Sequence, residues 1–437
     1  MSKKIMFKTE WLFYYTLAGV IRFLLMKPRY QEIISDRVEV STSLNSWKRV
    51  TEGVHLRNFG IDPYSGDLFH ETPLCLEAFS LMQKFLNDTF LKLFFIFTDF
   101  TTAWLIAATA KNYFTEVVKR EKEEIKINKI EKNRQYPILP ERPSMPHVAA
   151  VYLLNPFIIL NCVGLTTTVF TNFLFSLALY SMIKRSIFFS CLTISILTLQ
   201  GLYPATLMVP ATIYILRDKN ENEKFISIMK IIFIFFTILS LLFYISYIIV
   251  GSFSFIENTI GFILTVPDLR PNIGLYWYFF TEMFEHFRWL FIASFQINVN
   301  LLYVVPLALK LRRDPMLLAF SYLAIAAIFK SYPSIGDVGF YMSLLPLWKH
   351  LFQHMQQVFI VGCFMLFCTA FAPTVWHLWI FSRSANANFY FGVTLAFAIA
   401  QIFLLTDILF ASVKREFAMR HGLHLEINGE KAKLLLE

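Results

Sequence analysis

The chain has 437 residues, of which 56% are hydrophobic and only 16% are charged, against roughly 25% charged residues in an ordinary soluble domain. This balance excludes a soluble globular protein. The 48 Phe and the long uncharged runs also exclude disorder and nucleic-acid binding, although the formal net charge is +9. The five Cys share no metal-ligand spacing, so we expect neither a disulfide framework nor a metal site, and no cofactor is indicated.

Apolar stretches long enough to cross a membrane recur along the chain, since a spanning helix needs about 20 mostly apolar residues. Stretches without any Asp, Glu, Lys or Arg are 143–183, 186–216, 231–250, 289–309, 351–382 and 384–406. Shorter or interrupted candidates are 11–26, 93–110, 315–329 and 338–348. We therefore predict an all-α polytopic membrane protein, a single domain over 1–437 with about 10 to 12 transmembrane helices.

The distribution of Lys and Arg beside the spans predicts the orientation, because the cytoplasmic side retains these residues. Residues 27–75 carry six basic and seven acidic side chains, whereas 111–147 carry nine and six. We expect 27–75 to be a luminal loop and 111–147 a cytosolic loop. The polar tail 414–437 is expected to be cytosolic as well.

The predicted luminal loop contains a high density of groups that could act in catalysis. They are Asp36, Glu39, Asp62, Asp67, His70 and Glu71. Carboxylates beside a membrane suit general acid–base chemistry or a metal–phosphate clamp. The commoner alternative is a solvated luminal face. His70 and Glu71 do not begin a zinc motif, because no second His follows at the required interval.

The stretch from Pro267 to His286 combines turn residues with aromatic ones. Pro267, Pro271 and Gly274 predict a broken helix at its start. Glu282 and His286 would face the same way on a helix, but no further metal ligands accompany them. We expect a helix at the membrane interface. A cavity wall is the second interpretation, because irregular backbone at this depth is tolerated only against protein or a wet cavity.

Three ionisable residues, Asp99, Lys330 and Asp407, lie in apolar surroundings, where a charge costs several kcal/mol. For Lys330 and Asp407 we expect a partner or a position near a span end. Asp99 is open to a functional role.

The segment 376–389 places Ser384, Asn386 and Asn388 after two Trp and before an uncharged stretch. Amide side chains both donate and accept, which suits sugar hydroxyls and phosphate oxygens. A helix N-cap is the alternative for Ser384 and Asn386.

At these residues the chain resembles the U subunit of the glycosylphosphatidylinositol (GPI) transamidase, the PIG-U family. The matching blocks are RVEV at 37–40, LNSWKRV at 44–50, PYSG at 63–66, FHETPL at 69–74, YLLNP at 152–156, LYP at 202–204, VPDL at 266–269, PNIGL at 271–275, WYFF at 277–280, EMFEHF at 282–287, FQIN at 295–298, FKSYP at 329–333, WHLWI at 376–380 and SAN at 384–386. Long ungapped blocks are more specific than any short motif.

The resemblance implies a non-catalytic subunit, located in the endoplasmic reticulum membrane, of a complex that joins precursor proteins to a GPI lipid. A caspase-like subunit carries the catalytic residues there, and the other subunits and the GPI glycolipid are the implied partners. The carboxy-terminal signal of the precursor is a further candidate partner. The fold is implied to be similar to that of the multi-spanning GT-C type glycosyltransferases.

The family's two lipid-contacting amides correspond to Asn386 and Asn388. Lys224 and Arg288 are weaker candidates for the same lipid site, since a cation pairs well with phosphate. The alternative function is a luminal polyprenyl-phosphate-dependent mannosyltransferase of GPI biosynthesis that uses Asp62, Asp67 or Glu71.

Overall fold

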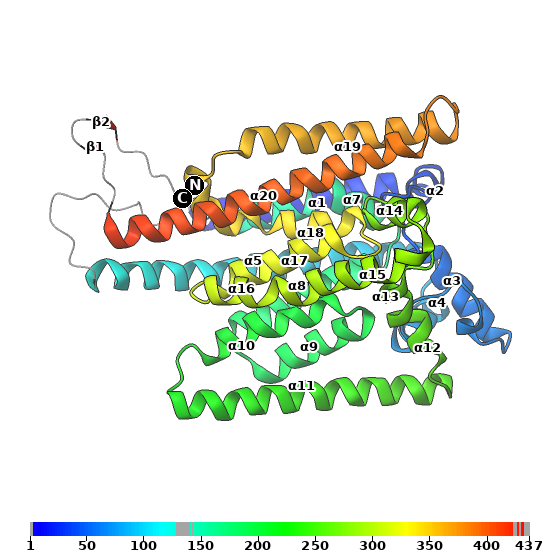
Figure 1. Cartoon of the computed structure of the whole chain (residues 1–437), viewed down its shortest axis with the longest axis horizontal. Coiled ribbons are helices and arrows are strands. Elements are labelled where there is room, and N and C mark those ends of the chain that lie inside the picture. Colours follow the sequence, from blue (N-terminus) through cyan, green and yellow to red (C-terminus); the bar gives the residue numbers. More distant parts are fainter. Residues whose placement is uncertain (1–2, 128–139, 142, 423–425, 428–429, 432–437) are drawn as a thin grey trace. The chain divides into compact units, whose positions relative to one another are not determined.

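The structure is a computed structural model that describes residues 3–127, 140–141, 143–422, 426–427 and 430–431 (Figure 1). Contacts divide the chain into two compact units, 1–109 with 149–343 and 110–148 with 344–437. Each unit is described by itself below.

The regular secondary structure of the described residues is helical except for one short strand pair. The first half contains α1 (Lys3–Leu25), α2 (Pro28–Ser35), α3 (Trp47–Asn58), η1 (Pro63–Ser65), α4 (Pro73–Phe85), α5 (Asp88–Ile127), α6 (Met145–Leu153), α7 (Pro156–Val163), α8 (Thr168–Ile183), α9 (Ile187–Gln200), η2 (Tyr203–Leu207) and α10 (Met208–Leu216). The second half contains α11 (Glu221–Val250), α12 (Ser254–Ile256), η3 (Glu257–Gly261), α13 (Phe262–Thr265), α14 (Tyr276–Glu282), α15 (Glu285–Ile297), η4 (Asn298–Leu302), α16 (Val304–Lys310), α17 (Pro315–Phe329), α18 (Ile335–Ser343), η5 (Leu345–His354), α19 (Val358–Ile380) and α20 (Ala387–His421). The antiparallel strands are β1 (Glu426–Ile427) and β2 (Glu430–Lys431).

The described part of the chain forms a multi-pass helical membrane protein, with fewer full-length spans than the sequence predicts. Five helices are long and apolar enough to cross: α5, α11, the continuous run Glu285–Lys310, α19 and α20. The bent pair α6 and α7, which turns by 54°, would make a sixth. Several of the other predicted spans are short helices, such as the 14-residue α9 and the 15-residue α17. At 1.5 Å per residue these cover about 22 Å, less than the roughly 30 Å hydrocarbon core.

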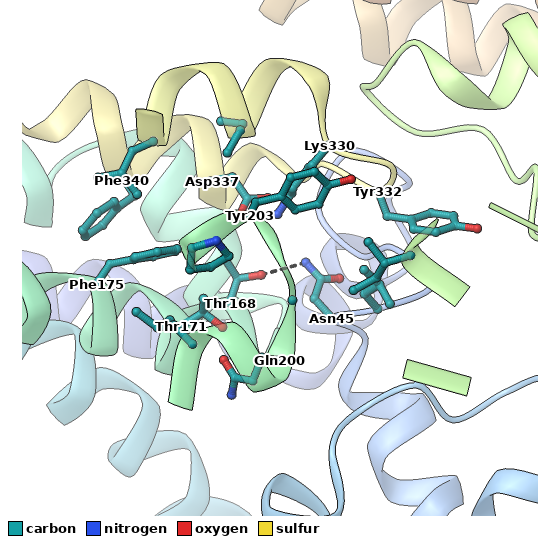
Figure 2. Close-up of a pocket in the computed structure, with 18 of the residues that line it drawn as sticks. Asn45, Thr168, Thr171, Phe175, Gln200, Tyr203, Lys330, Tyr332, Asp337 and Phe340 are labelled. Atoms are coloured by element: carbon teal, nitrogen blue, oxygen red, sulfur yellow. Dashed lines mark hydrogen bonds and ion pairs between the residues drawn. The ribbon is translucent and has the colours of Figure 1, made fainter. Parts of the chain in front are cut away.

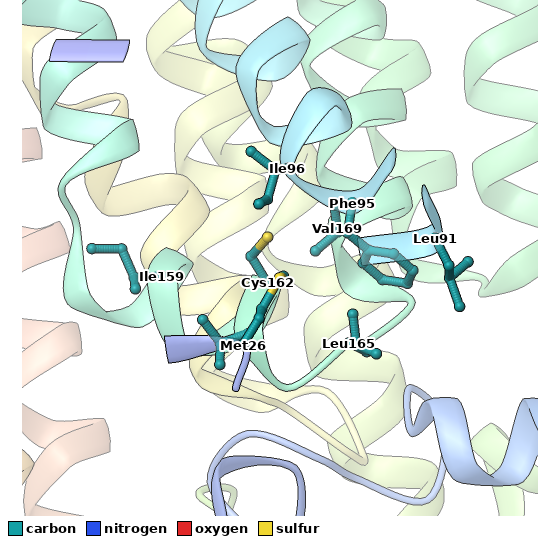
Figure 3. Close-up of a cluster of buried hydrophobic side chains, with 9 residues drawn as sticks. Met26, Leu91, Phe95, Ile96, Ile159, Cys162, Leu165 and Val169 are labelled. Atoms are coloured by element: carbon teal, nitrogen blue, oxygen red, sulfur yellow. The ribbon is translucent and has the colours of Figure 1, made fainter. Parts of the chain in front are cut away.

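The first unit has a hydrophobic core where α5, α7 and α8 meet the end of α1. Figure 3 shows part of it, with Met26, Phe95, Cys162 and Val169 directed toward one another. Trp47 of α3 packs edge-on against Phe95, with 5.3 Å between ring centroids. This contact ties the predicted luminal loop to the helix bundle.

The helix predicted to be broken after Pro267 is broken. No helix covers residues 267–275, and Val266 before them has a φ of +51°. A second break separates α14 from α15. Glu282 ends α14 and His286 lies in α15, so the two do not share a helix face. Pro267 lines a cavity, as the second interpretation of this segment predicts.

The second unit contains the hairpin of α19 and α20, which lie side by side in Figure 1. Asp407 of α20 accepts hydrogen bonds from the backbone N–H groups of Gln356 and Gln357, at 3.0 and 2.9 Å, and so satisfies the start of α19. Arg415 makes a buried pair with Glu121 of α5, at 2.8 Å. The predicted tail thus begins inside a helix, since α20 continues to His421.

Candidate functional site

The predicted amides lie at the turn between α19 and α20. The turn is closed by the Ser384 N–H, which donates to the Leu378 carbonyl at 2.9 Å, and Arg383 has a φ of +54°. Asn386 is the N-cap of α20, because its Oδ1 accepts from the N–H of Phe389 at 3.3 Å. Asn388 lies in the first turn of α20, and both amides are exposed.

Aromatic rings and an apolar helix face adjoin this turn. Trp376 packs against Trp379 and Tyr390, with centroid separations of 5.4 and 5.1 Å. Leu366 in the middle of α19 is 72% exposed, and Phe381 at the turn is 68% exposed. Exposing such a face to water is unfavourable, whereas contact with lipid acyl chains is favourable. The amides therefore lie at the polar end of a surface suited to acyl chains.

The structure does not bring Lys224 and Arg288 together. Lys224 lies in the first turn of α11, where it contacts Glu221 at 2.6 Å. The far end of α11 leads through α12 and η3 to Val266, whose carbonyl accepts from Arg288 at 2.7 Å. Lys224 therefore lies at the start of α11, whereas Arg288 contacts the segment that follows the end of α11.

The acidic residues of loop 27–75 separate into those used for folding and those that line cavities. Asp36 pairs with Lys48, Glu39 pairs with Arg37, and Asp62 caps η1. Asp67 lines the cavity beside Pro267. His70 lines both this cavity and a second one within the bundle, which Glu71 also lines.

This second cavity, of about 140 Å³, has both polar and apolar walls and lies where loop 27–75 meets α8, α9, α17 and α18. Figure 2 shows Phe175 and Phe340 at one end and Tyr332 at the other. Between them lie hydroxyl, amide and charged side chains, which include Asn45, Thr171, Gln200, Lys330 and Asp337. Lys330 is paired with Asp337 at 2.6 Å, which confirms that it has a partner.

Glu71 is the cavity-lining carboxylate that lacks a basic partner among the described residues. Thr167 and Cys75 lie beside its carboxyl group and favour the ionised form. Burial nevertheless raises the pKa of the Glu71 carboxyl to about 7. Burial also lowers the pKa of His70, so its ring is neutral at pH 7.

The cavity could be found only in part from the sequence. Loop 27–75 was noted for its acids, but Thr171, Asn172 and Gln200 lie in apolar helices with no local signal. Their proximity to Glu71 depends on packing between segments more than 90 positions apart. Within the described ranges, no group of three His, Cys, Asp or Glu residues could hold a metal ion.

Comparisons with known proteins agree with the features of this chain. The family model "GPI transamidase subunit PIG-U" matches residues 16–397. The chain is 40% identical to the GPI-anchor transamidase component PIGU of Mus musculus and to that of Homo sapiens, over 96% of this chain and 98% of each relative. It is 29% identical to the GPI transamidase component GAB1 of Saccharomyces cerevisiae, over 89% of this chain and 91% of that protein. The chain therefore belongs to the PIG-U family of GPI transamidase subunits.

Proposed function

We propose that the chain is a non-catalytic component of a GPI transamidase in the endoplasmic reticulum membrane, where it binds and orients the GPI lipid for attachment to precursor proteins. The family match and the printed names of the relatives support the assignment to the complex. The observation that carries the lipid role is the exposure of Asn386 and Asn388 beside the apolar face of α19.

The apolar face of α19 and the two amides would contribute differently to lipid binding. Acyl chains on α19 would supply affinity in proportion to the apolar area they cover. The amides of Asn386 and Asn388 would fix the head group, because each amide can both donate to phosphate oxygens and accept from hydroxyls. Holding the lipid amine near an acyl group on the caspase-like partner subunit would make the transfer effectively intramolecular.

Arg288 and Lys224 would have to act on different parts of a ligand or on different molecules. Arg288 already donates to Val266 and lies 3.6 Å from Glu285, yet a guanidinium has five N–H donors and could still meet a phosphate. Lys224 is paired with Glu221 at the start of α11, at 2.6 Å. We assign the head group to Asn386 and Asn388 first, with Arg288 and Lys224 as separate candidates. The precursor's signal segment is a further candidate ligand.

We also propose that the four short apolar helices, α8, α9, the run Tyr203–Leu216 and α17, belong to interrupted crossings. With the six candidates above they would bring the total to ten, the lower end of the predicted 10 to 12. Their apolar composition supports this count. The same arrangement would be that of a GT-C type scaffold. Loop 27–75 would be luminal, and residues 111–147 and 414–437 cytosolic.

The lipid assignment can be tested with a photoreactive GPI probe. We expect the double change Asn386→Ala and Asn388→Ala to leave the complex assembled but to reduce crosslinking of this chain to the probe. Loss of the α20 cap should cost about 1 kcal/mol. Asn87→Ala is the matched control, because Asn87 is also an exposed Asn that caps a long helix, through the N–H of Phe90. Undiminished labelling of the double variant in an assembled complex would refute the assignment.

The mannosyltransferase alternative predicts a different accumulated glycolipid when the chain is removed. Loss of a transferase leaves a truncated glycan, whereas loss of a transamidase component leaves complete GPI and uncleaved precursor proteins. Family membership favours the second result.

A further inference from the structure

The cavity beneath loop 27–75 has hydrogen-bonding capacity that the described residues do not use. Asn172 is 1% exposed and its Oδ1 has no hydrogen-bond partner among them. Oε1 of Gln200 also has no hydrogen-bond partner among the described residues, while its Nε2 donates to Sγ of Cys75 at 3.1 Å. Both residues line the cavity. Buried acceptors without partners are rare in folded proteins and call for a donor from water or a ligand.

The charges around the cavity favour a ligand that donates protons or carries a positive charge. Lys330 is the basic lining residue other than His70, and Asp337 neutralises it at 2.6 Å. His70 is neutral because burial lowers its pKa. Glu71 has no basic partner among the described residues. A phosphate would therefore meet an acidic site, whereas an ammonium would find a carboxylate without a counterion.

The remaining walls fit a small ring or chain with several hydroxyls. The hydroxyl of Thr171 lines the cavity, as do those of Thr167 and Thr168. Phe175 and Phe340 close one end with their rings 5.6 Å apart. In Figure 2 these rings lie on the opposite side of the cavity from Tyr332. An acyl chain would pack against the apolar walls but would leave the two unpartnered acceptors without a donor.

We propose that this cavity binds a hydroxylated primary amine, with the ammonium on the Glu71 carboxylate and the hydroxyls on Thr171, Asn172 and Gln200. An amino sugar and an ethanolamine-type group share this chemistry. The proposal does not depend on the assignment of Asn386 and Asn388, which lie in the other unit of the chain.

The pKa of Glu71 supports this assignment and predicts that ligand binding depends on pH. Burial raises this pKa to about 7, so the carboxyl is partly protonated at neutral pH. The titratable groups around it are Tyr64, whose hydroxyl donates to the Glu71 backbone carbonyl at 2.9 Å, Cys75 on α4, the adjacent His70, and the Lys330–Asp337 pair across the cavity. An ammonium beside Glu71 would favour the ionised form and release its proton.

The test uses the full chain in lipid nanodiscs and ligand-observed NMR titrations with glucosamine, glucose, N-acetylglucosamine and ethanolamine. We expect glucosamine to bind at least about tenfold more tightly than glucose or N-acetylglucosamine, because a hydrogen bond to a charged group contributes about 1.5–3 kcal/mol. Ethanolamine separates the two sources: if it binds as tightly as glucosamine, the site takes a simple amino alcohol. Between pH 5 and 7, glucosamine affinity should rise as Glu71 loses its proton.

Three variants make the outcome specific. Glu71→Gln should remove the preference for glucosamine and its pH dependence while glucose binding persists. Thr171→Val should weaken glucosamine and glucose alike. Glu32→Gln, an exposed carboxylate of α2, should change neither. Equal affinity for glucose and glucosamine, or binding of none of the probes, would overturn the proposal, and the second result would mean that the cavity holds water only.

Discussion

Arg22 and Asp99 form an ion pair in which both side chains are completely buried. Nε of Arg22 donates to Oδ2 of Asp99 at 3.0 Å. The hydroxyl of Tyr152 donates to the other carboxylate oxygen at 3.0 Å, and Arg22 also donates to the Leu153 carbonyl at 2.8 Å. The pair therefore joins α1, α5 and α6 at one point. Asp99, which the sequence left open to a functional role, has a structural one.

Removal of either partner should strongly destabilise the protein. Asp99→Asn or Arg22→Met would leave one buried charge without a counterion, at a cost of about 3–5 kcal/mol. We expect the double variant to lose less than the sum of the single losses, because it leaves no unpaired charge. Unfolding of the purified chain in mixed detergent micelles would measure these differences.

The exposed pair of Lys48 and Asp36 is the control, since its side chains are 61% and 59% exposed. Asp36→Asn should cost less than about 1 kcal/mol. Equal losses for Asp36→Asn and Asp99→Asn would contradict the role given to burial.

The sequence predicted the long spans and several polar contacts because those signals are local. The uncharged stretch 231–250 became most of α11, and Asn386 formed the cap expected of its residue type. It could not predict the partner of Asp99, because Arg22 lies 77 positions away. The sequence also predicted too many full-length spans, because composition does not show where a helix bends or ends. The break between α14 and α15 is such a case.

A glycine of α18 should tolerate no side chain. A Cβ on Gly336 would lie 2.5 Å from Cγ of Asn161, which is fully buried and bonded to Thr166. We expect Gly336→Ala to destabilise the chain by about 1–3 kcal/mol through overpacking. Gly362→Ala in α19 is the control, because a Cβ there meets nothing within 4 Å. That change should be neutral or should stabilise by up to about 1 kcal/mol, since Ala favours helix. Thermal unfolding of both variants would show the opposite signs.

Glu71 should make stability fall as the pH rises through neutrality. Its folded pKa, about 7, lies above the ordinary value of 4.5, so the folded state binds more protons between these two values. The stabilising contribution is complete below about pH 4.5 and is lost as the pH passes about 7. We expect the difference in unfolding free energy between wild type and Glu71→Gln to change across this window, with wild type relatively less stable at pH 8. A pH-independent difference would show that burial does not raise this pKa.

The amide part of the candidate lipid site could be proposed from the sequence, because Asn386 and Asn388 lie close together in the chain. The cavity beneath loop 27–75 could not be predicted, because Glu71, Asn172 and Gln200 come from a loop and two helices that only packing brings together. Local motifs thus identify sites made by one turn of chain. Sites made by several segments need the fold.

The capping and lipid-binding roles of Asn386 can be separated by changing it to Ser. A Ser hydroxyl also accepts from the N–H of the third helical residue, so Asn386→Ser should change stability by only a few tenths of a kcal/mol, whereas Asn386→Ala should cost about 1 kcal/mol. Ser lacks the amide N–H₂ that would donate to a phosphate oxygen. Crosslinking to the GPI probe should therefore fall in both variants, although only one loses stability. If labelling instead follows stability, with Ser equal to wild type, Asn386 acts on the lipid only by shaping the start of α20.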